Sequence, residues 1–365
     1  MSVFTACEDV TLELFERCRS LSSLAIVGTA KNVGKTTTMN WLIERFEARG
    51  IRLGLTSVGR DGEDLDMVTD RPKPRITPPP GTLVATAHLS AKRSSARLKE
   101  VRPTPFRTAI GPVSIYEVQT MGTVEVAGPV SMGDTRRLVE MLRELGAKQV
   151  IVDGAIDRRA SAASDLAEGV ILATGLALSE DPEEVVRRTA AHVRWLQLPS
   201  APFAVPQEAG ALLSTAAGVS EDNFRPWPGK SLLEQGDELA RWLPAEAEAL
   251  VLPGAFTEAM ARGLMKRIAE APRALAVVVP DGTHVLMDPE AFEALEARGV
   301  KVYASRPIQL VAVTVNPTSP QGASTDPARF RARMEAELGT LPVYDLVLEQ
   351  ARAGASGLID GLARQ

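Results

Sequence analysis

The sequence predicts an α/β protein whose main sheet is mostly parallel and doubly wound, with an additional α/β unit toward the C-terminus. An apolar run, Leu24–Val27, leads through a glycine-containing turn, residues 28–37, into a helical pattern. A second apolar, β-branched run, residues 149–153, ends at the carboxylate of Asp153. Strand and helix patterns alternate again from 249 to 315. Such alternation is typical of a parallel sheet covered by helices.

The expected helices carry apolar residues at helical spacing, and the expected strands are short apolar or alternating runs. In chain order the sequence predicts a helix over 3–20, strand 24–27, helix 37–49, strand 51–58, an extended proline-rich connection over 70–81, strand 83–87, helix 91–100, a hairpin of 113–119 with 123–127, helix 131–146, strands 149–153 and 169–174, helix 181–195, strand 249–252, helix 257–270, strand 274–279, helix 289–299, strands 300–304 and 310–315, helix 327–338 and strand 341–346.

These elements suggest two domains. Residues 1–199 are expected to form the first, built around residues 28–37, and residues 200–365 a second α/β unit. Two arrangements stay open. Residues 310–346 fit either the second unit or the last strands of the first sheet, and residues 200–309 fit either an insertion or a separate domain.

Composition narrows the function classes. The chain has 365 residues and a net charge of −5 with interspersed signs, whereas nucleic-acid binding needs clustered Lys and Arg. No apolar run reaches the length of a membrane span, and the acidic N-terminal segment is unlike a signal peptide. We therefore expect a cytoplasmic protein that binds neither nucleic acid nor membrane.

Cysteine and histidine offer no metal or disulfide pattern. The two cysteines, Cys7 and Cys18, fall in one expected helix, where a disulfide is geometrically unfavourable. The histidines, His88, His192 and His284, are far apart in sequence and lack the spacing of metal ligands.

The turn at residues 28–37, which we call the glycine loop, has the composition of a phosphate-binding loop. Glycines let backbone N–H groups point inward, the helix N-terminus adds partial positive charge, and Lys35 would reach the β/γ-phosphates. Thr36 would hold Mg²⁺. The usual pattern places a glycine at position 29, but here it stands at Gly28. The alternative is a packing turn between strand and helix. The residues predicted to bind nucleotide are Gly28, Thr29, Asn32, Val33, Gly34, Lys35, Thr36 and Thr37.

Asp153 is the second expected site residue. A buried strand that ends in a carboxylate, downstream of such a loop, would place Asp153 at the carboxyl edge of the sheet. There it could orient a Mg²⁺ water and act in catalysis.

The glycine loop, Gly-Thr-Ala-Lys-Asn-Val-Gly-Lys-Thr, resembles that of P-loop NTPases of the dethiobiotin synthetase, cobyrinate synthase and partition ATPase superfamily. The resemblance implies ATP and Mg²⁺ as cofactors. It also implies a catalytic, metal-approaching carboxylate after the second strand, for which Asp61 is the candidate; an acidic solvated loop is the alternative. Asn316 would contact adenine, or else belong to an Asn-Pro turn. Dethiobiotin synthetases have a Lys-Pro pair where this chain has Thr56-Ser57.

Over nearly its full length the chain also resembles the small P-loop subunit of the reactivase for lysine 5,6-aminomutase, a cobalamin-dependent enzyme. The sequence segments that carry this resemblance are Thr56–Glu63, Val126–Pro129, Val152–Arg159, Val251–Ala255 and Val315–Pro317. The resemblance implies a partner ATPase subunit and a client mutase.

Three functions follow as alternatives: a nucleotide-driven switch or reactivase component, a ligase that phosphorylates a small carboxylate or carbamate, and a nucleotide-binding scaffold without hydrolysis. ATP is favoured over GTP because the Asn-Lys-x-Asp guanine motif is absent from the sequence. Partition ATPases form dimers through a lysine near the position of Lys31. Lys31 is therefore a candidate catalytic residue of a homodimer, with a solvated lysine as the alternative.

Overall fold

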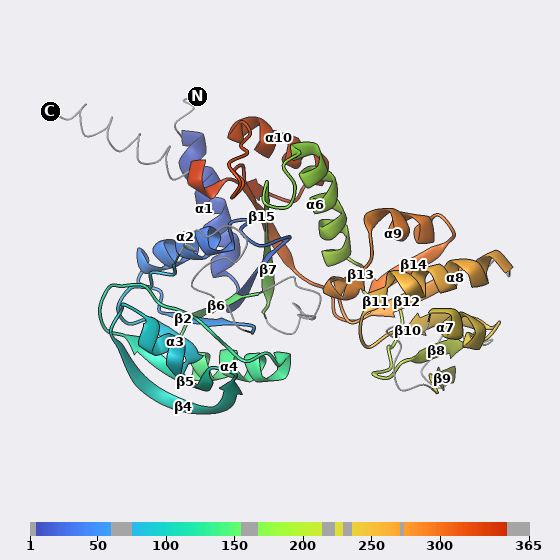
Figure 1. Cartoon of the computed structure of the whole chain (residues 1–365), viewed down its shortest axis with the longest axis horizontal. Coiled ribbons are helices and arrows are strands. Elements are labelled where there is room, and N and C mark those ends of the chain that lie inside the picture. The colour runs from blue at the N-terminus through green and yellow to red at the C-terminus, as the bar shows by residue number, and fades with distance from the viewer. Residues whose placement is uncertain are drawn as a thin grey trace. The chain divides into compact units, whose positions relative to one another are not determined.

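The computed structural model describes residues 5–59, 75–154, 167–213, 223–228, 236–270 and 274–348. Within these residues the chain is a mixed α/β protein that divides into two compact units (Figure 1). The first unit holds the described residues up to Ala190 and those from Gln309 onward, and the second holds Ala191–Ile308. The predicted α/β class, with a large and mostly parallel sheet, is confirmed.

The first unit is built on a nine-stranded sheet with the order β16-β15-β7-β1-β6-β2-β3-β5-β4. The pairs from β16 to β3 are parallel, and β5 pairs antiparallel with both β3 and β4. The strands are β1 (Ser23–Gly28), β2 (Leu53–Ser57), β3 (Leu83–Ala87), β4 (Leu98–Thr108), β5 (Gly111–Val118), β6 (Gln149–Asp153), β7 (Gly169–Gly175), β15 (Leu310–Asn316) and β16 (Val343–Tyr344).

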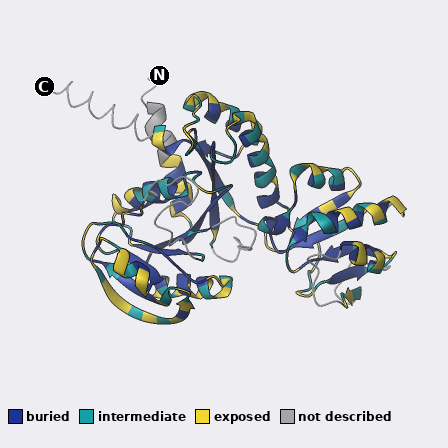
Figure 2. Ribbon diagram, viewed as in Figure 1, coloured by how far each residue is buried: buried dark blue, intermediate teal, exposed yellow. Residues whose placement is uncertain are grey.

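Helices cover both faces of this sheet. Buried residues of α1 (Thr5–Arg19) and α2 (Lys35–Glu47) form one core with the β1 side chains Leu24 and Ile26. On the opposite face, Gly54 of β2 leaves room for Leu142 of α4 (Met132–Glu144), and α6 (Pro182–Leu196) bonds to β7. Figure 2 shows the central strands as the buried interior, and exposed residues on the outer sides of the helices and along β4. The other helices are α3 (His88–Arg93) and α10 (Pro327–Leu338).

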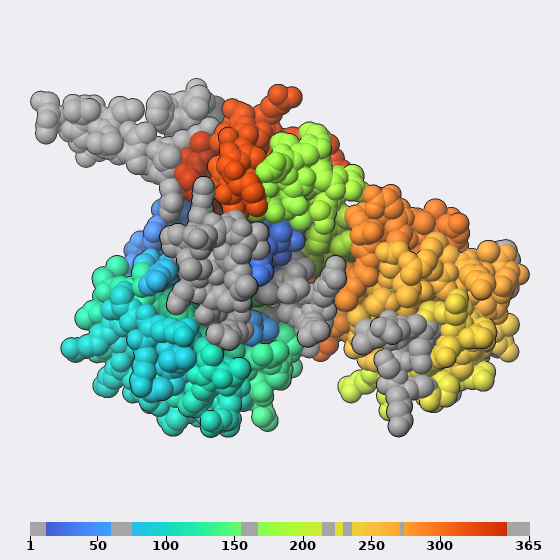
Figure 3. Space-filling model, in the orientation of Figure 1, coloured from blue at the N-terminus to red at the C-terminus, as the bar shows by residue number. Residues whose placement is uncertain are grey.

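The hairpin was predicted at the wrong strands. The sequence predicts a helix over 91–100 and pairing of 113–119 with 123–127. In the structure α3 ends at Arg93, β4 begins at Leu98, and β5 pairs with β4 and β3. The reason is that β4 is an edge strand with many exposed polar side chains and two prolines, Pro103 and Pro105, so that it lacks an apolar alternation. Gly111, with φ of 121°, begins β5 just after the turn. The region of β4 and β5, coloured teal, is seen on the face of the first unit that Figure 3 shows.

Residues 310–346 lie in the first unit. β15 pairs with β7 and β16 pairs with β15, so the chain returns to the first sheet after the second unit. The second unit is therefore an insertion that begins within α6, at Ala191, and ends at Ile308, before β15.

The second unit has a five-stranded sheet with the order β14-β12-β10-β8-β9, in which β10, β12 and β14 are parallel. The chain near the start of this unit pairs with the chain near its end, through a bridge between Ser200 and Ala304. Its elements are β8 (Gly210–Leu213), β9 (Phe224–Pro226), α7 (Gly236–Trp242), β10 (Ala247–Val251), β11 (Phe256–Thr257), α8 (Glu258–Glu270), β12 (Leu275–Val279), the short 3-10 helix η2 (Gly282–His284), β13 (Val285–Leu286), α9 (Pro289–Glu296) and β14 (Val300–Ala304). None of the helices in the described ranges of either unit is long and apolar enough to cross a membrane.

Cys18 provides a test of the packing of α1. Its side chain is fully buried in the core of the first unit, and desolvation raises the pKa of its thiol from 9.0 to about 12. The thiolate population near pH 8 falls roughly a thousandfold as a result. In a Cys7→Ser background we expect Ellman's reagent to label Cys18 only after the protein is unfolded in denaturant. Rapid labelling of the native protein would show that α1 does not pack as described.

Candidate functional site

The predicted site residues gather at the carboxyl edge of the first sheet. β1 ends at Gly28 and β6 ends at Asp153, on neighbouring parallel strands. On the other side of β1, β7 ends at Gly175 and β15 ends at Asn316, which pair with one another. The strand order reverses around β1, because β2 and β3 lie to one side of it and β7 and β15 to the other. In open α/β sheets, ligands bind at the carboxyl ends of strands at such a reversal.

The glycine loop connects β1 to α2 through two left-handed residues. Asn32 has φ of 62° and Gly34 has φ of 100°, a conformation that favours glycine. Gly34 is the N-cap residue of α2 and has no side chain to cap the helix. The first-turn N–H groups, which belong to Lys35, Thr36 and Thr37, therefore lack a side-chain cap within the part of the chain that the structure describes.

The structure shows why residue 28, one position before the usual glycine of such loops, is a glycine. A Cβ atom on Gly28 would lie 2.9 Å from Cγ2 of Val33 and 3.0 Å from the Cγ and Cδ atoms of Lys35. The stem of Lys35 therefore passes directly over the backbone of Gly28. Thr29, where a glycine is usual, donates a hydrogen bond from its hydroxyl to that of Thr174 of β7 at 3.1 Å.

The ammonium group of Lys35 lies at the end of β6. Its Nζ donates a hydrogen bond to the carbonyl oxygen of Gly154 at 3.0 Å and lies 3.5 Å from Oδ1 of Asp153. The two side chains keep only 19% and 14% of their exposure. An ammonium group has three N–H donors. The contacts with Gly154 and Asp153 therefore leave one donor for a further anion.

Asn316 lies beside the end of the glycine loop. The Cβ atom of Asn316 lies 3.5 Å from the position that a Cβ atom on Gly34 would occupy. Its Oδ1 accepts hydrogen bonds from the backbone N–H of Thr318 at 3.2 Å and from the Thr318 hydroxyl at 2.9 Å. This is the geometry of an Asn-Pro turn, one of the two alternatives for this residue.

Two further predicted residues are Asp61 and Lys31. Asp61 lies outside the described residues. At the end of the described chain before it, the N–H of Val58 donates to the carbonyl oxygen of Asp153 at 3.0 Å, and that of Gly59 donates to the carbonyl oxygen of Pro129 at 2.9 Å. Lys31 is exposed in the glycine loop.

Sequence reasoning missed the threonine hydroxyls that brace the glycine loop. Thr174 of β7 bonds to Thr29, and Thr38 of α2 bonds to Thr314 of β15 at 2.9 Å. A single threonine in an apolar run is not distinctive, and its partner lies far away in sequence. The Gly154 carbonyl that receives Lys35 also carries no sequence signal.

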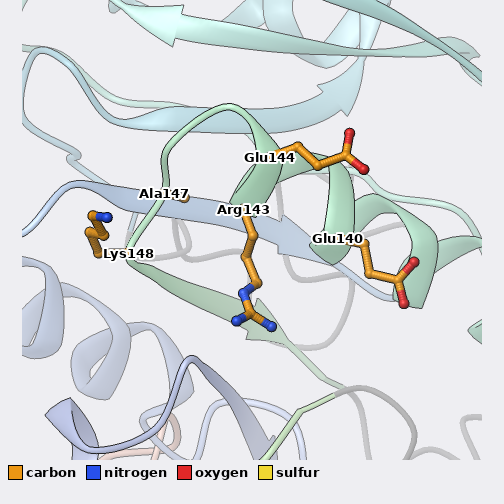
Figure 4. A pocket seen from close by; sticks show the side chains of 5 residues that line it. All are labelled: Glu140, Arg143, Glu144, Ala147 and Lys148. Carbon is orange, nitrogen blue, oxygen red and sulfur yellow. The ribbon is translucent and has the colours of Figure 1, made fainter.

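A groove of about 500 Å³ lies elsewhere, at the amino-terminal end of β6 (Figure 4). It is lined by Glu140, Arg143, Glu144, Ala147 and Lys148. Charged side chains on an open surface surround it, and Asp153 lies at the opposite end of β6. This groove is therefore not part of the candidate site.

Comparisons with known proteins found no matching protein-family model, curated protein or solved structure. Among the described residues there is also no group of three or more His, Cys, Asp and Glu side chains that could hold a metal ion by themselves.

The contact between Gly28 and Lys35 leads to a prediction. Gly28→Ala should force the Lys35 stem aside, and overpacking of this kind costs about 1–3 kcal/mol. Gly133→Ala is the matched control, because its Cβ would meet only Oγ of Ser131 at 3.8 Å, at the start of α4. Urea unfolding should show a loss of stability for Gly28→Ala alone. Equal stabilities of the two variants would contradict the close approach.

Proposed function

We propose that the chain binds a nucleoside triphosphate with Mg²⁺ at the glycine loop, as a P-loop NTPase, and uses hydrolysis as a conformational switch. The observation that carries the proposal is the position of Lys35. Lys35 is the first residue of α2 and follows a left-handed glycine, and its ammonium group lies beside the carboxylate of Asp153. Helix N-termini and lysine both attract phosphate.

The residues fit the charge of this ligand. Phosphate oxygens can replace the Gly154 carbonyl as acceptors for Lys35, while backbone N–H groups of the first turn of α2 donate to the same oxygens. Thr36 and Asp153, with Asp61 from outside the described residues, offer the oxygen ligands that Mg²⁺ prefers. When bound, the cation neutralises phosphate charge. Mg²⁺ keeps several waters and binds through few carboxylates, so it does not require a cluster of acidic side chains.

Two buried side chains favour a switch over a ligase. Thr56 and Ser57 stand where dethiobiotin synthetases have a Lys-Pro pair, and both are buried. The Thr56 hydroxyl lies 3.3 Å from the carbonyl oxygen of Ala85, and the Ser57 hydroxyl accepts a hydrogen bond from the N–H of Gly128 at 2.9 Å. These two positions therefore carry hydroxyls bonded within the scaffold, where the ligase would have the charge of a lysine.

The protein partners are proposed only on the resemblance of the sequence to the small reactivase subunit. We propose that the switch acts with an ATPase subunit on a cobalamin-dependent aminomutase, as a reactivase component, and that ATP is the nucleotide. The Oδ1 atom of Asn316 is bonded to Thr318, so a contact with the base would use the amide N–H groups of this side chain.

Lys31 supports a homodimer as part of the same proposal. Its exposed position in the glycine loop leaves it able to reach phosphates of its own or of a second subunit. A contribution across subunits would make ATPase activity per protomer rise with protein concentration, and Lys31→Ala would remove that rise.

The first test is nucleotide affinity. Lys35→Met keeps much of the apolar stem but removes the ammonium group, and charge-assisted hydrogen bonds of this kind contribute roughly a tenfold to hundredfold change in affinity. Titration with a fluorescent ATP analogue should show this loss. Lys148→Ala, at the opposite end of β6, is the control and should bind as wild type does. Equal affinities for wild type and Lys35→Met would contradict the proposal that the nucleotide binds at this loop.

The second test separates binding from hydrolysis. Asp153→Asn keeps the shape of the side chain but removes the charge that would orient the metal shell. We expect nearly unchanged nucleotide affinity and a loss of most Mg²⁺-dependent phosphate release, on the order of tenfold or more. Wild-type turnover in this variant would mean that Asp153 only ends a strand and pairs with Lys35.

A further inference from the structure

A line of threonine hydroxyls runs from the glycine loop into the core of the first unit. The Thr29 hydroxyl bonds to that of Thr174 at 3.1 Å, and Thr174 bonds to Thr189 of α6 at 2.7 Å. Thr174 and Thr189 are both fully buried. The line therefore joins the loop, β7 and α6 through side chains alone.

A second pair braces the other end of the loop on the same side of β1. The Thr38 hydroxyl lies 2.9 Å from that of Thr314 on β15, and 3.2 Å from the carbonyl oxygen of Gly34. Both threonines are buried. The two sides of the loop thus differ: charged groups lie toward β6, and neutral hydroxyls lie toward β7 and β15.

Packing alone does not explain these threonines. Valine has nearly the same shape, and a buried hydroxyl costs free energy unless it is paired. Here each hydroxyl along the line has at least one hydroxyl partner, and the first member is the loop residue that replaces the usual glycine. Thr29 is also fixed through its main chain, because its N–H donates to the carbonyl oxygen of Ala173 at 2.9 Å.

We propose that Thr29, Thr174 and Thr189 are positioning residues that hold the glycine loop in its phosphate-receiving conformation before the ligand arrives. They also tie that conformation to α6. The inference rests on the proposed function for the identity of the ligand. Its physical basis is preorganisation: a loop that is already ordered loses less conformational entropy when phosphate binds.

The proposal predicts two measurable effects of Thr174→Val. Without ligand, amide hydrogen exchange in peptides covering residues 28–37 should become faster, because the start of the loop loses its brace. Affinity for the fluorescent ATP analogue should fall about three- to tenfold, the range expected for one net hydrogen bond. Thr174→Ser keeps the Oγ atom and should restore both properties.

Thr56→Val is the matched control. Thr56 is a threonine of the same sheet, equally buried, and its hydroxyl lies near the carbonyl oxygen of Ala85 rather than near the glycine loop. It should lose stability as Thr174→Val does, but loop exchange and affinity should not change. If Thr174→Val does not fold, Thr189→Val interrupts the line at its far end. It should shift loop exchange and affinity in the same direction but less, because the bond between Thr29 and Thr174 remains.

The outcomes separate the two proposals. Equal loop exchange in Thr174→Val and Thr56→Val would overturn the positioning role, whatever the ligand. Absence of ATP-analogue binding by the wild type would overturn the proposed function, and faster loop exchange in the ligand-free Thr174→Val variant would still support the positioning role.

Discussion

Lys35 reaches the end of β6 because its side chain crosses the bare backbone of Gly28. A methyl group at this position would lie 3.0 Å from the lysine stem, so the ion pair with Asp153 depends on a glycine at the last residue of β1. The parallel register of β1 and β6, which places Ile26 opposite Asp153, brings the carboxylate to the same edge. The proposed phosphate site therefore depends on one close approach and on the pairing of two strands.

Local patterns predicted the residues of the candidate site that carry a signal in their own neighbouring sequence. The order of apolar strand, glycine loop and helix identified Gly34 and Lys35, and an apolar run ending in a carboxylate identified Asp153. The partners of these residues could not be predicted in this way. Thr174 and Thr314 reach the glycine loop from strands far away along the chain, and their positions follow from the strand order, which depends on long-range pairing.

The errors in the fold have the same origin. β4 lacks an apolar alternation because it lies at the edge of the sheet, and edge strands carry charges and prolines that prevent pairing with other chains. The place of residues 310–346 stayed open for a related reason: a parallel strand carries no local sign of the sheet to which it belongs. The structure assigns β15 to the first sheet because its partner is β7.

The insertion of the second unit has a consequence for folding. β15 can pair with β7 only after the chain has closed a loop that contains residues 191–308. Within this unit the chain near its start is bonded to the chain near its end, since the N–H of Ala201 donates to the carbonyl oxygen of Ala304 at 3.0 Å. Once the unit has folded, the flexible part of the loop shrinks from roughly a hundred residues to roughly ten, which lowers the entropic cost of closure by about 2 kcal/mol. Folding of the inserted unit thus favours completion of the sheet that surrounds the glycine loop, through chain entropy.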